Sequence, residues 1–231
     1  MNGPERAPVL YNVAMRFSTA LAAAALAALP ALGAPPAGPA AAAHALARKV
    51  QAHYVRTQDL EARFVQTYTY AGLGRRQASR GRLLVKKPGR MRWDYEEPAR
   101  KTIAVVGSRL VQYEPEVNQA YVDDHFDATA MSAAVTFLLG KGDLEKEFEI
   151  SMGEKGALVL VPRKPDPRVE SVSLSVGPEG EVTATRVVDG SGNSNEIAFS
   201  DLKRNAGLAD ADFEVRLPKD VHRVEAPGAR R

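Results

Sequence analysis

The segment KKPGRMRWDYEEP, residues 86–98, contains the only Trp of this 231-residue chain, between two prolines. Because the side chains of a β-strand alternate between its two faces, a strand here places Met91, Trp93 and Tyr95 on one face. The opposite face then carries Arg90, Arg92 and Asp94. A packed core would explain a row of large apolar side chains behind a charged face. An apolar pocket is the alternative explanation.

Short alternating runs with close connections follow one another along most of the chain. Gly107-Ser108 is a two-residue hairpin signal, and GPEGE at 177–181 is another tight turn. We expect about eleven strands, at residues 64–70, 79–86, 90–95, 102–106, 109–113, 119–123, 148–152, 157–161, 169–176, 182–188 and 195–202. This spacing predicts an antiparallel meander that curls into a barrel or half-barrel. A last short strand is expected at 213–217, where apolar residues alternate before a proline.

Two segments have a helical pattern. Between residues 43 and 60, Leu46, Val50 and Tyr54 recur at a spacing of four, which predicts one amphipathic helix. Residues 127–143 predict a second helix, with capping residues at both ends. One of its faces carries Met131, Val135, Leu138 and Leu139. A helix that plugs one mouth of a barrel and a movable lid both fit this pattern, and composition alone favours the plug.

The N-terminus has the organisation of a secretory signal peptide. Arg6 and Arg16 precede an apolar core that is short for a bilayer span and is followed by small residues. Cleavage after Gly33 or within residues 40–43 both fit, and a retained membrane anchor is the alternative. We expect a signal peptide (1–33), a disordered Pro/Ala linker (34–43), one domain (44–223) and a flexible tail (224–231). With no second apolar span, we expect a soluble, exported protein.

Composition excludes several classes of function. The 31 basic and 28 acidic residues are interleaved, so the net charge of +3 gives no nucleic-acid signature. The absence of Cys excludes disulfides, thiolate catalysis and cysteine-ligated zinc. The acidic residues around His125 lack the ligand count of a calcium loop. No serine-hydrolase elbow, Walker motif or dinucleotide fingerprint occurs. We therefore expect no enzyme activity, no metal site and no cofactor.

Five pieces of the sequence, in order, resemble one known family. They are LEARFVQTY (60–68), GRLLVKKPGRMRWDYEEP (81–98), VVGSRLVQYEPEVNQAYV (105–122), TFLLG (136–140) and ADFEVRLPKDV (211–221). The chain resembles the periplasmic outer-membrane lipoprotein carriers, the LolA family, from about residue 45 to 223. The most specific feature is the spacing of Lys, Pro, Trp and Tyr within residues 86–98.

The resemblance implies an unclosed antiparallel β-barrel, a half-barrel of about eleven strands, with a helical lid over a hydrophobic cavity. It also implies a monomeric periplasmic carrier that takes triacylated lipoproteins from an inner-membrane ABC-type exporter to an outer-membrane receptor. The residues expected to contact the acyl chains are Phe64, Leu83, Val85, Met91, Trp93, Tyr95, Met131, Val135, Leu138 and Leu139. The receptor shares the fold but is itself a lipoprotein, so the absence of Cys favours the carrier.

Lys87 departs from the family pattern. In the family, an Arg before the first proline of this segment holds the lid closed through hydrogen bonds. Lysine is a point donor without the fork of arginine, so lid control is either looser here or supplied by another residue. Met91 stands where the family commonly has Phe, and its flexible side chain suits an adaptable apolar surface.

Two other functions compete with the carrier. A sensor of the same half-barrel type would bind lipid or a mislocalised lipoprotein and regulate an envelope-stress pathway, but such regulators usually carry a second domain. A secreted hydrolase would need carboxylates such as Asp94, Glu96 or Glu97, yet nothing in the sequence places two of them across a cleft.

Overall fold

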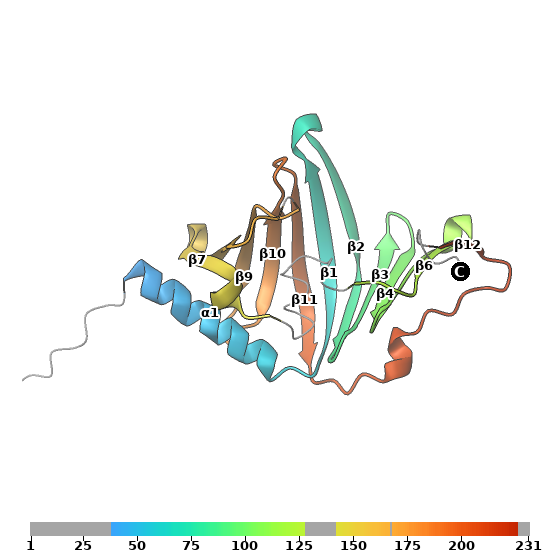
Figure 1. Cartoon of the computed structure of the whole chain (residues 1–231), viewed down its shortest axis with the longest axis horizontal. Coiled ribbons are helices and arrows are strands. Elements are labelled where there is room, and N and C mark those ends of the chain that lie inside the picture. Colours follow the sequence, from blue (N-terminus) through green and yellow to red (C-terminus); the bar gives the residue numbers. More distant parts are fainter. Residues whose placement is uncertain (1–37, 128–141, 167, 226–231) are drawn as a thin grey trace, which may run out of the picture. The chain divides into compact units, whose positions relative to one another are not determined.

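Twelve β-strands form a single sheet in the computed structural model, which describes residues 38–127, 142–166 and 168–225 (Figure 1). The strands are β1 (Asp59–Tyr70), β2 (Arg75–Lys86), β3 (Arg90–Glu97), β4 (Lys101–Val106), β5 (Arg109–Glu114), β6 (Gln119–Asp123), β7 (Phe148–Met152), β8 (Leu158–Pro162), β9 (Ser171–Val176), β10 (Val182–Val188), β11 (Ser194–Arg204) and β12 (His222–Glu225). Their order is β12-β6-β5-β4-β3-β2-β1-β11-β10-β9-β8-β7. The sheet is therefore unclosed, with β12 and β7 at its two ends.

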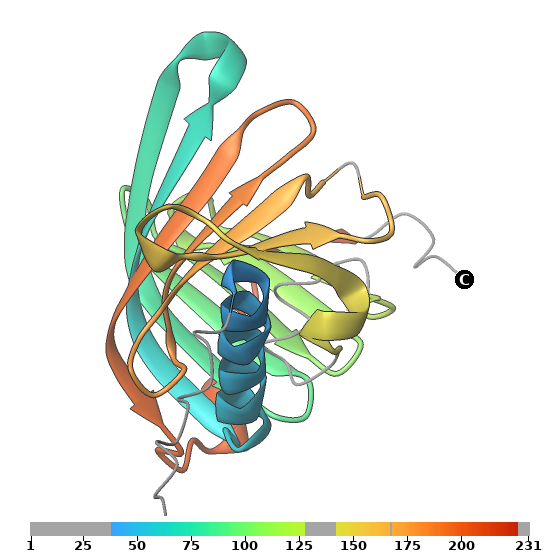
Figure 2. The same ribbon diagram turned by 90° about the vertical axis from the view of Figure 1, so that its left-hand side faces the viewer.

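The sheet consists of two antiparallel meanders joined along one seam. Strands β1 to β6 pair consecutively, and so do β7 to β11. The seam is the pairing of β1 with β11, in which Phe64 lies opposite Phe199. The expected half-barrel of sequential hairpins is confirmed. Figure 2 shows the sheet curling behind a single long helix.

The hairpin expected at Gly107-Ser108 is confirmed, because β4 and β5 pair directly on either side of it. Gly107 has a φ of +63°, a left-handed conformation that glycine adopts without the steric cost of a side chain. The turn therefore depends on a residue without Cβ, as two-residue hairpins commonly do.

The first helix is shorter at its C-terminal end than the sequence predicts. Helix α1 (Pro39–Val55) ends five residues before Leu60, which belongs to β1. The Thr57 hydroxyl donates to the carbonyl of His53 at 2.9 Å. The Asp59 carboxylate accepts from the backbone N of Ala206 at 2.6 Å. The Asp59 bond joins the start of β1 to a segment distant in sequence, so the chain leaves the helix and enters the sheet here.

Helix α1 also begins earlier than expected, since residues 39–43 are helical rather than part of a disordered linker. Ala43, Ala47, Val50 and Tyr54 are buried on one face of the helix. This face packs onto strands of the second meander and places α1 across the concave side of the sheet (Figure 2). None of the described helices is long and apolar enough to cross a membrane.

The remaining helical elements among the described residues are short. They are α3 (Leu144–Glu147) and the 3-10 turns η1 (Ala71–Leu73), η2 (Pro115–Val117), η4 (Glu154–Gly156) and η5 (Asp210–Phe213). Asp143 caps α3 by accepting from the backbone N of Glu145 at 3.0 Å. The helix expected over 127–143, with Met131, Val135, Leu138 and Leu139, lies almost entirely outside the described residues.

The strand expected at 213–217 is wrong. Phe213 ends the turn η5 and is fully buried, while the following residues form no strand. Arg92 explains the difference, because its guanidinium donates to the carbonyls of Asp212 at 3.1 Å and Glu214 at 2.9 Å. These carbonyls bond a side chain instead of a neighbouring strand. The segment thus lies as a strap against β3 and β4.

The strap leads to a twelfth strand that the sequence did not reveal. Strand β12 spans the boundary that was expected at residue 223 between the domain and a flexible tail. It pairs with β6 in parallel rather than antiparallel orientation. The backbone N of His222 donates to the carbonyl of Asn118 at 2.9 Å, which starts the pairing. Four residues suffice for this strand because β6 supplies a ready edge of unpaired backbone groups.

Gly81 is expected to be the least tolerant position of β2. A Cβ at Gly81 would lie 1.9 Å from the backbone oxygen of Asp94 on β3 and 3.0 Å from the Phe64 ring. We predict that Gly81→Ala lowers the free energy of unfolding by about 1–3 kcal/mol, the usual cost of overpacking. Urea denaturation followed by circular dichroism measures this change.

Gly72 provides the matched control, because a Cβ there would meet no atom within 4 Å. Gly72→Ala should change the unfolding free energy by less than about 0.5 kcal/mol, as surface substitutions usually do. Equal effects of the two substitutions would contradict the close approach of β2 and β3.

Candidate functional site

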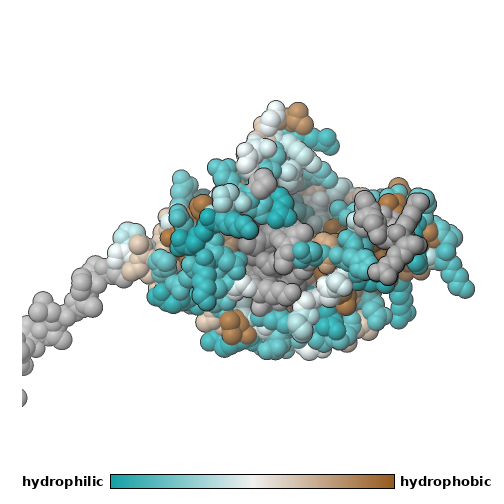
Figure 3. Space-filling model, viewed as in Figure 1, coloured by the Kyte–Doolittle hydropathy of each residue, from teal (hydrophilic) through white to brown (hydrophobic). Residues whose placement is uncertain are grey.

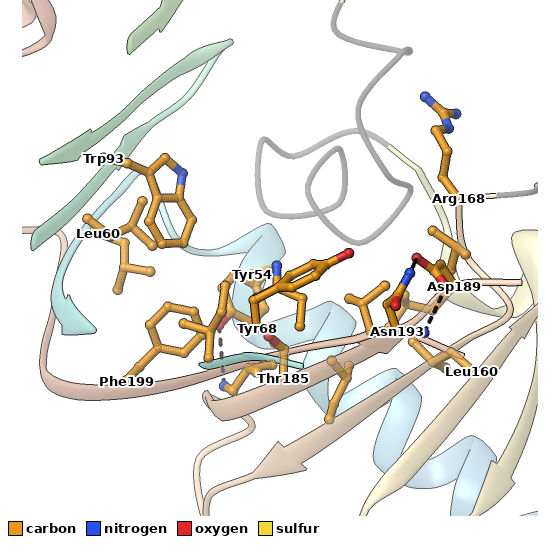
Figure 4. A pocket seen from close by; sticks show the side chains of 18 of the residues that line it. Tyr54, Leu60, Tyr68, Trp93, Leu160, Arg168, Thr185, Asp189, Asn193 and Phe199 are labelled. Atoms are coloured by element: carbon orange, nitrogen blue, oxygen red, sulfur yellow. Dashed lines mark hydrogen bonds between the residues drawn. The ribbon is translucent and has the colours of Figure 1, made fainter. Parts of the chain in front are cut away.

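The concave side of the sheet holds a cavity of about 290 Å³ (Figure 4). Its lining is mainly apolar and comes from both meanders. The apolar lining residues are Leu60, Leu83, Trp93, Leu144, Leu160, Val169, Leu174, Val182, Val187, Ile197, Phe199 and Leu202. Pockets that bind organic ligands are typically lined in this way, with few polar groups.

Several polar residues that line the cavity are engaged in hydrogen bonds, including Arg168, whose guanidinium donates to the carboxylate of Asp166 at 2.7 Å. Asn195 accepts from the side chain of Gln66 at 2.8 Å. Asp189 accepts from the side chain of Asn193 at 2.9 Å, and this bond, with bonds from turn amides, holds the pKa of Asp189 below its usual value. The bonds to Asp189 organise the turn between β10 and β11. Most of the cavity surface that a ligand could touch is apolar.

The sequence-predicted acyl site falls into two layers. Leu83 and Trp93 line the cavity directly. Phe64, Val85 and Met91 are almost fully buried in the hydrophobic core beneath it. None of these three residues is among those that line the cavity, and Met91 fits the core explanation of the opening segment.

An aromatic cluster connects the core to the cavity wall. The Phe64 ring meets Trp93 edge-on with centroids 4.8 Å apart and meets Tyr95 edge-on at 5.1 Å. The indole N–H of Trp93 lies 3.0 Å from the sulfur of Met91. Edge-to-face aromatic contacts stabilise such arrangements by about 0.5–1.5 kcal/mol each. The cluster therefore fixes the orientation of the one Trp that faces the cavity.

The wall from the second meander was missed by sequence reasoning. Val187, Ile197 and Phe199 line the cavity from β10 and β11. The strands themselves were expected, and the alternation of Asn195, Ile197 and Phe199 marks one face of β11. What the sequence did not show is that β11 lies beside β1, which turns this face toward Trp93.

Tyr54 supplies the floor of the cavity from α1. Its side chain is 4% exposed, and its hydroxyl accepts from the backbone N of Val182 on β10 at 3.3 Å. Burial raises the pKa of the Tyr54 phenol to about 12. The neutral form is thus strongly preferred in the folded protein, in keeping with an apolar surrounding.

Lys87 binds the end of α1. Its ammonium group donates to the backbone carbonyl of Tyr54, and its backbone N donates to the carbonyl of Gln58 at 2.8 Å. Partial burial lowers the pKa of the Lys87 amine. The residue therefore ties the end of β2 to the last turn of the helix that floors the cavity. Its expected partner, the lid segment predicted at 127–143, lies almost entirely outside the described residues.

The described residues include no group of three or more His, Asp or Glu side chains arranged to hold a metal ion. The acidic residues near His125 are therefore not gathered into such a group within the described part of the chain. The cluster at the cavity is aromatic and aliphatic, so its available chemistry is the binding of apolar groups.

The fold is an open half-barrel with a mainly apolar cavity on its concave side. A family model described as "Outer membrane lipoprotein carrier protein LolA" matches residues 56–216, and the chain belongs to this family. The resemblance found in the sequence is thereby confirmed.

Curated relatives agree over most of the chain. An outer-membrane lipoprotein carrier protein of Alkalilimnicola ehrlichii is 29% identical over 179 residues, which cover 77% of this chain and 83% of the relative. The outer-membrane lipoprotein carrier protein of Dechloromonas aromatica is 30% identical over 166 residues, which cover 70% of this chain and 79% of the relative. A crystal structure of a LolA superfamily protein from Nitrosomonas europaea aligns with 75% of this chain and 97% of its own, at 14% identity and a TM-score of 0.42.

The raised pKa of Tyr54 predicts alkaline destabilisation. An unfolded Tyr ionises near pH 10, whereas the folded phenol ionises near 12. The stability that the neutral phenol contributes is complete below pH 10 and is lost as pH rises through 12, because the unfolded state releases its proton first. We expect a loss of about 2–3 kcal/mol across this window. Urea unfolding at several pH values measures it.

Tyr54→Phe removes the titrating group and should flatten this part of the pH profile. Tyr95, whose pKa burial also raises, remains in both proteins and serves as a constant background. The same slope in the wild type and in Tyr54→Phe would contradict the assignment to Tyr54.

Proposed function

We propose that this protein is a carrier that shelters the acyl chains of triacylated lipoproteins in its concave cavity. The observation that carries the proposal is the apolar cavity itself, walled by both meanders and facing the single Trp. Family membership and the names of the relatives support the same role. A binding role rather than catalysis agrees with an aliphatic and aromatic lining.

The physics of acyl chains explains why such a cavity is needed. Each methylene buried from water contributes about 0.8 kcal/mol, and two or more acyl chains anchor a protein stably in a membrane. A triacylated protein therefore cannot cross an aqueous compartment unaided. A cavity that replaces the membrane must be apolar, yet it must release its load, which favours many weak contacts over a few strong ones.

We propose that the cavity widens when the acyl chains are loaded. The sheet is unclosed, and its two edges β7 and β12 are not paired with each other. We propose that separation of α1 from the sheet enlarges the cavity, with residues Met131, Val135, Leu138 and Leu139 acting as the lid.

The wider pathway follows from the carrier role. We propose export to the periplasm through a signal peptide at 1–33, followed by a short linker before α1 and a carrier domain that includes β12. The cargo would come from an inner-membrane ABC-type lipoprotein exporter and pass to an outer-membrane receptor. We further propose that the carrier acts as a monomer, with no cofactor.

The proposed acyl site combines both walls of the cavity. Leu83 and Trp93 would touch the chains directly, and Tyr95 would flank them. Phe64, Val85 and Met91 would support these residues from the core rather than contact the empty cavity. Phe199 and Ile197, on the opposite wall, extend the set that the sequence suggested.

Release of lipoproteins from energised spheroplasts tests the proposal. Purified protein is added to spheroplasts of the source bacterium, and lipid-modified proteins bound to it are sought in the supernatant. We predict ATP-dependent release into the complex. Phe199→Glu should reduce this release by about tenfold or more, because a charge in the cavity must be desolvated by the bound chains.

Val65→Glu is the matched control. Val65 is 54% exposed, follows Phe64 on β1 and lies on the outer face, so its charge stays in water. The Val65→Glu variant should release lipoproteins as well as the wild-type protein does. Absence of release by folded wild-type protein would contradict the carrier and would make the lipid-sensing alternative the next to test. Equal loss in both variants would contradict the location of the site.

Lys87 is the residue that we propose controls closure. An arginine there could donate to the Tyr54 carbonyl and to a second acceptor at once, whereas lysine provides a single point of contact. We predict that Lys87→Arg weakens binding of an apolar fluorescent dye by about threefold, and that Lys87→Met, which removes the donor, strengthens it. Dye titration measures both. Unchanged affinity in both variants would contradict a role in closure.

A further inference from the structure

The β1–β2 hairpin extends past the neighbouring strands and ends in an exposed tip (Figures 1 and 2). The tip consists of η1 and the strand ends that flank it, Tyr70 on one side and Arg75 and Arg76 on the other. Leu73, at the end of η1, is 78% exposed. It is the most exposed large hydrophobic residue among those the structure describes. Figure 3 shows an apolar spot at this apex with hydrophilic surface beside it.

The tip is strongly basic. Residues 62 to 93 contain no Asp or Glu. Arg80, nearer the body of the sheet, forms an ion pair with Glu97. Within the described part of the chain, Arg75 and Arg76 form no such pair, and both are exposed. Their charge is therefore available to an outside partner.

The tip is held in place rather than left loose. The backbone N of Ala71 donates to the side chain of Asn193 at 3.1 Å, which joins the tip to the turn between β10 and β11. This turn contains one acid, Asp189, whose carboxylate accepts bonds from Asn193 and from turn amides. The nearby negative charge is thus already engaged within its own turn.

The tip is continuous with the cavity. The Tyr70 ring contacts Tyr68 edge-on, with centroids 4.5 Å apart, and Tyr68 lines the cavity. Tyrosine places an apolar ring against hydrocarbon and a hydroxyl against water, as suits the interface of a membrane. The Tyr68–Tyr70 contact therefore joins the base of the tip to the lining of the cavity.

We propose that this hairpin tip is a contact surface for anionic lipid bilayers. Leu73 inserts among the acyl chains at the interface, Arg75 and Arg76 bind anionic headgroups, and Tyr68 and Tyr70 lie at headgroup level. The cavity then opens toward the lipid. The proposal goes beyond the carrier role, because it gives the chain a membrane contact of its own that needs neither cargo nor receptor.

One leucine and two arginines give weak attachment. Each basic residue near an anionic surface changes binding by about fivefold, and a single inserted side chain adds little more. A shuttle must leave the membrane again, so weak and reversible contact fits the task. Binding should also fall as salt is raised, because the arginine charges are exposed and are screened.

The absence of Cys allows a direct test on the full chain. Leu73→Cys is labelled with a polarity-sensitive fluorophore, and the protein is mixed with phosphatidylglycerol-containing vesicles that hold no protein. Val117→Cys is the matched control, since Val117 is 64% exposed on another 3-10 turn. The label reports its own surroundings, so membrane binding by another part of the chain cannot imitate the result.

We expect a blue shift at position 73, none at 117, and little at either with phosphatidylcholine vesicles. Arg75→Glu with Arg76→Glu should weaken the shift at 73 by about tenfold or more in lipid concentration. No shift at 73, an equal shift at 117, or a shift that is unaffected by vesicle charge and by the arginine variants would overturn the proposal. So would a shift that appears only when the vesicles contain an envelope protein. Because no lipoprotein is present, these outcomes are independent of the carrier role.

Discussion

Pairing of β1 with β11 is the interaction on which the cavity depends. Each meander alone is a curved set of hairpins with one apolar face. The seam brings these faces together, so that Phe64 meets Phe199 across it and Trp93 shares a cavity with Ile197. The two strands are far apart in sequence, and closing so long a loop costs entropy that must be offset by apolar burial along the seam. The cavity therefore results from the long-range order of the sheet, while its individual strands result from local turns.

The two faces of β3 illustrate how one strand serves both structure and binding. Its apolar side chains build the aromatic cluster that orients Trp93. Its charged face holds the strap, because Arg90 pairs with Asp210 at 2.9 Å and Arg92 bonds backbone carbonyls. The same alternation thus secures the outer side of the sheet and leaves the inner side apolar. The charged face of β3 thus binds the strap, and this structural role explains why it lies opposite the large rings.

Much of this fold could be predicted from sequence because its signals are local. Turn residues such as Gly107 predict the hairpins, and the alternation of apolar and polar residues predicts the two faces of each strand. The same reasoning failed for β12 and for the strap. Four residues give too short a pattern, and Phe213 is buried by a contact with β3 and β4 that alternation does not encode. At the site, Leu83 and Trp93 line the cavity and Met91 lies in the core, while the wall of Ile197 and Phe199 follows only from the register of the seam.

Acyl chains bound by the carrier that we propose would occupy the cavity between the two meanders. Because the chain has a single Trp and that residue faces the cavity, its fluorescence reports one place. A synthetic triacylated lipopeptide with bromine atoms on its acyl chains would be titrated into the protein, with the unbrominated lipopeptide as control. The account predicts saturable quenching of Trp93 by the brominated compound alone. Binding of the lipopeptide, shown by native mass spectrometry, without bromine-dependent quenching would contradict it.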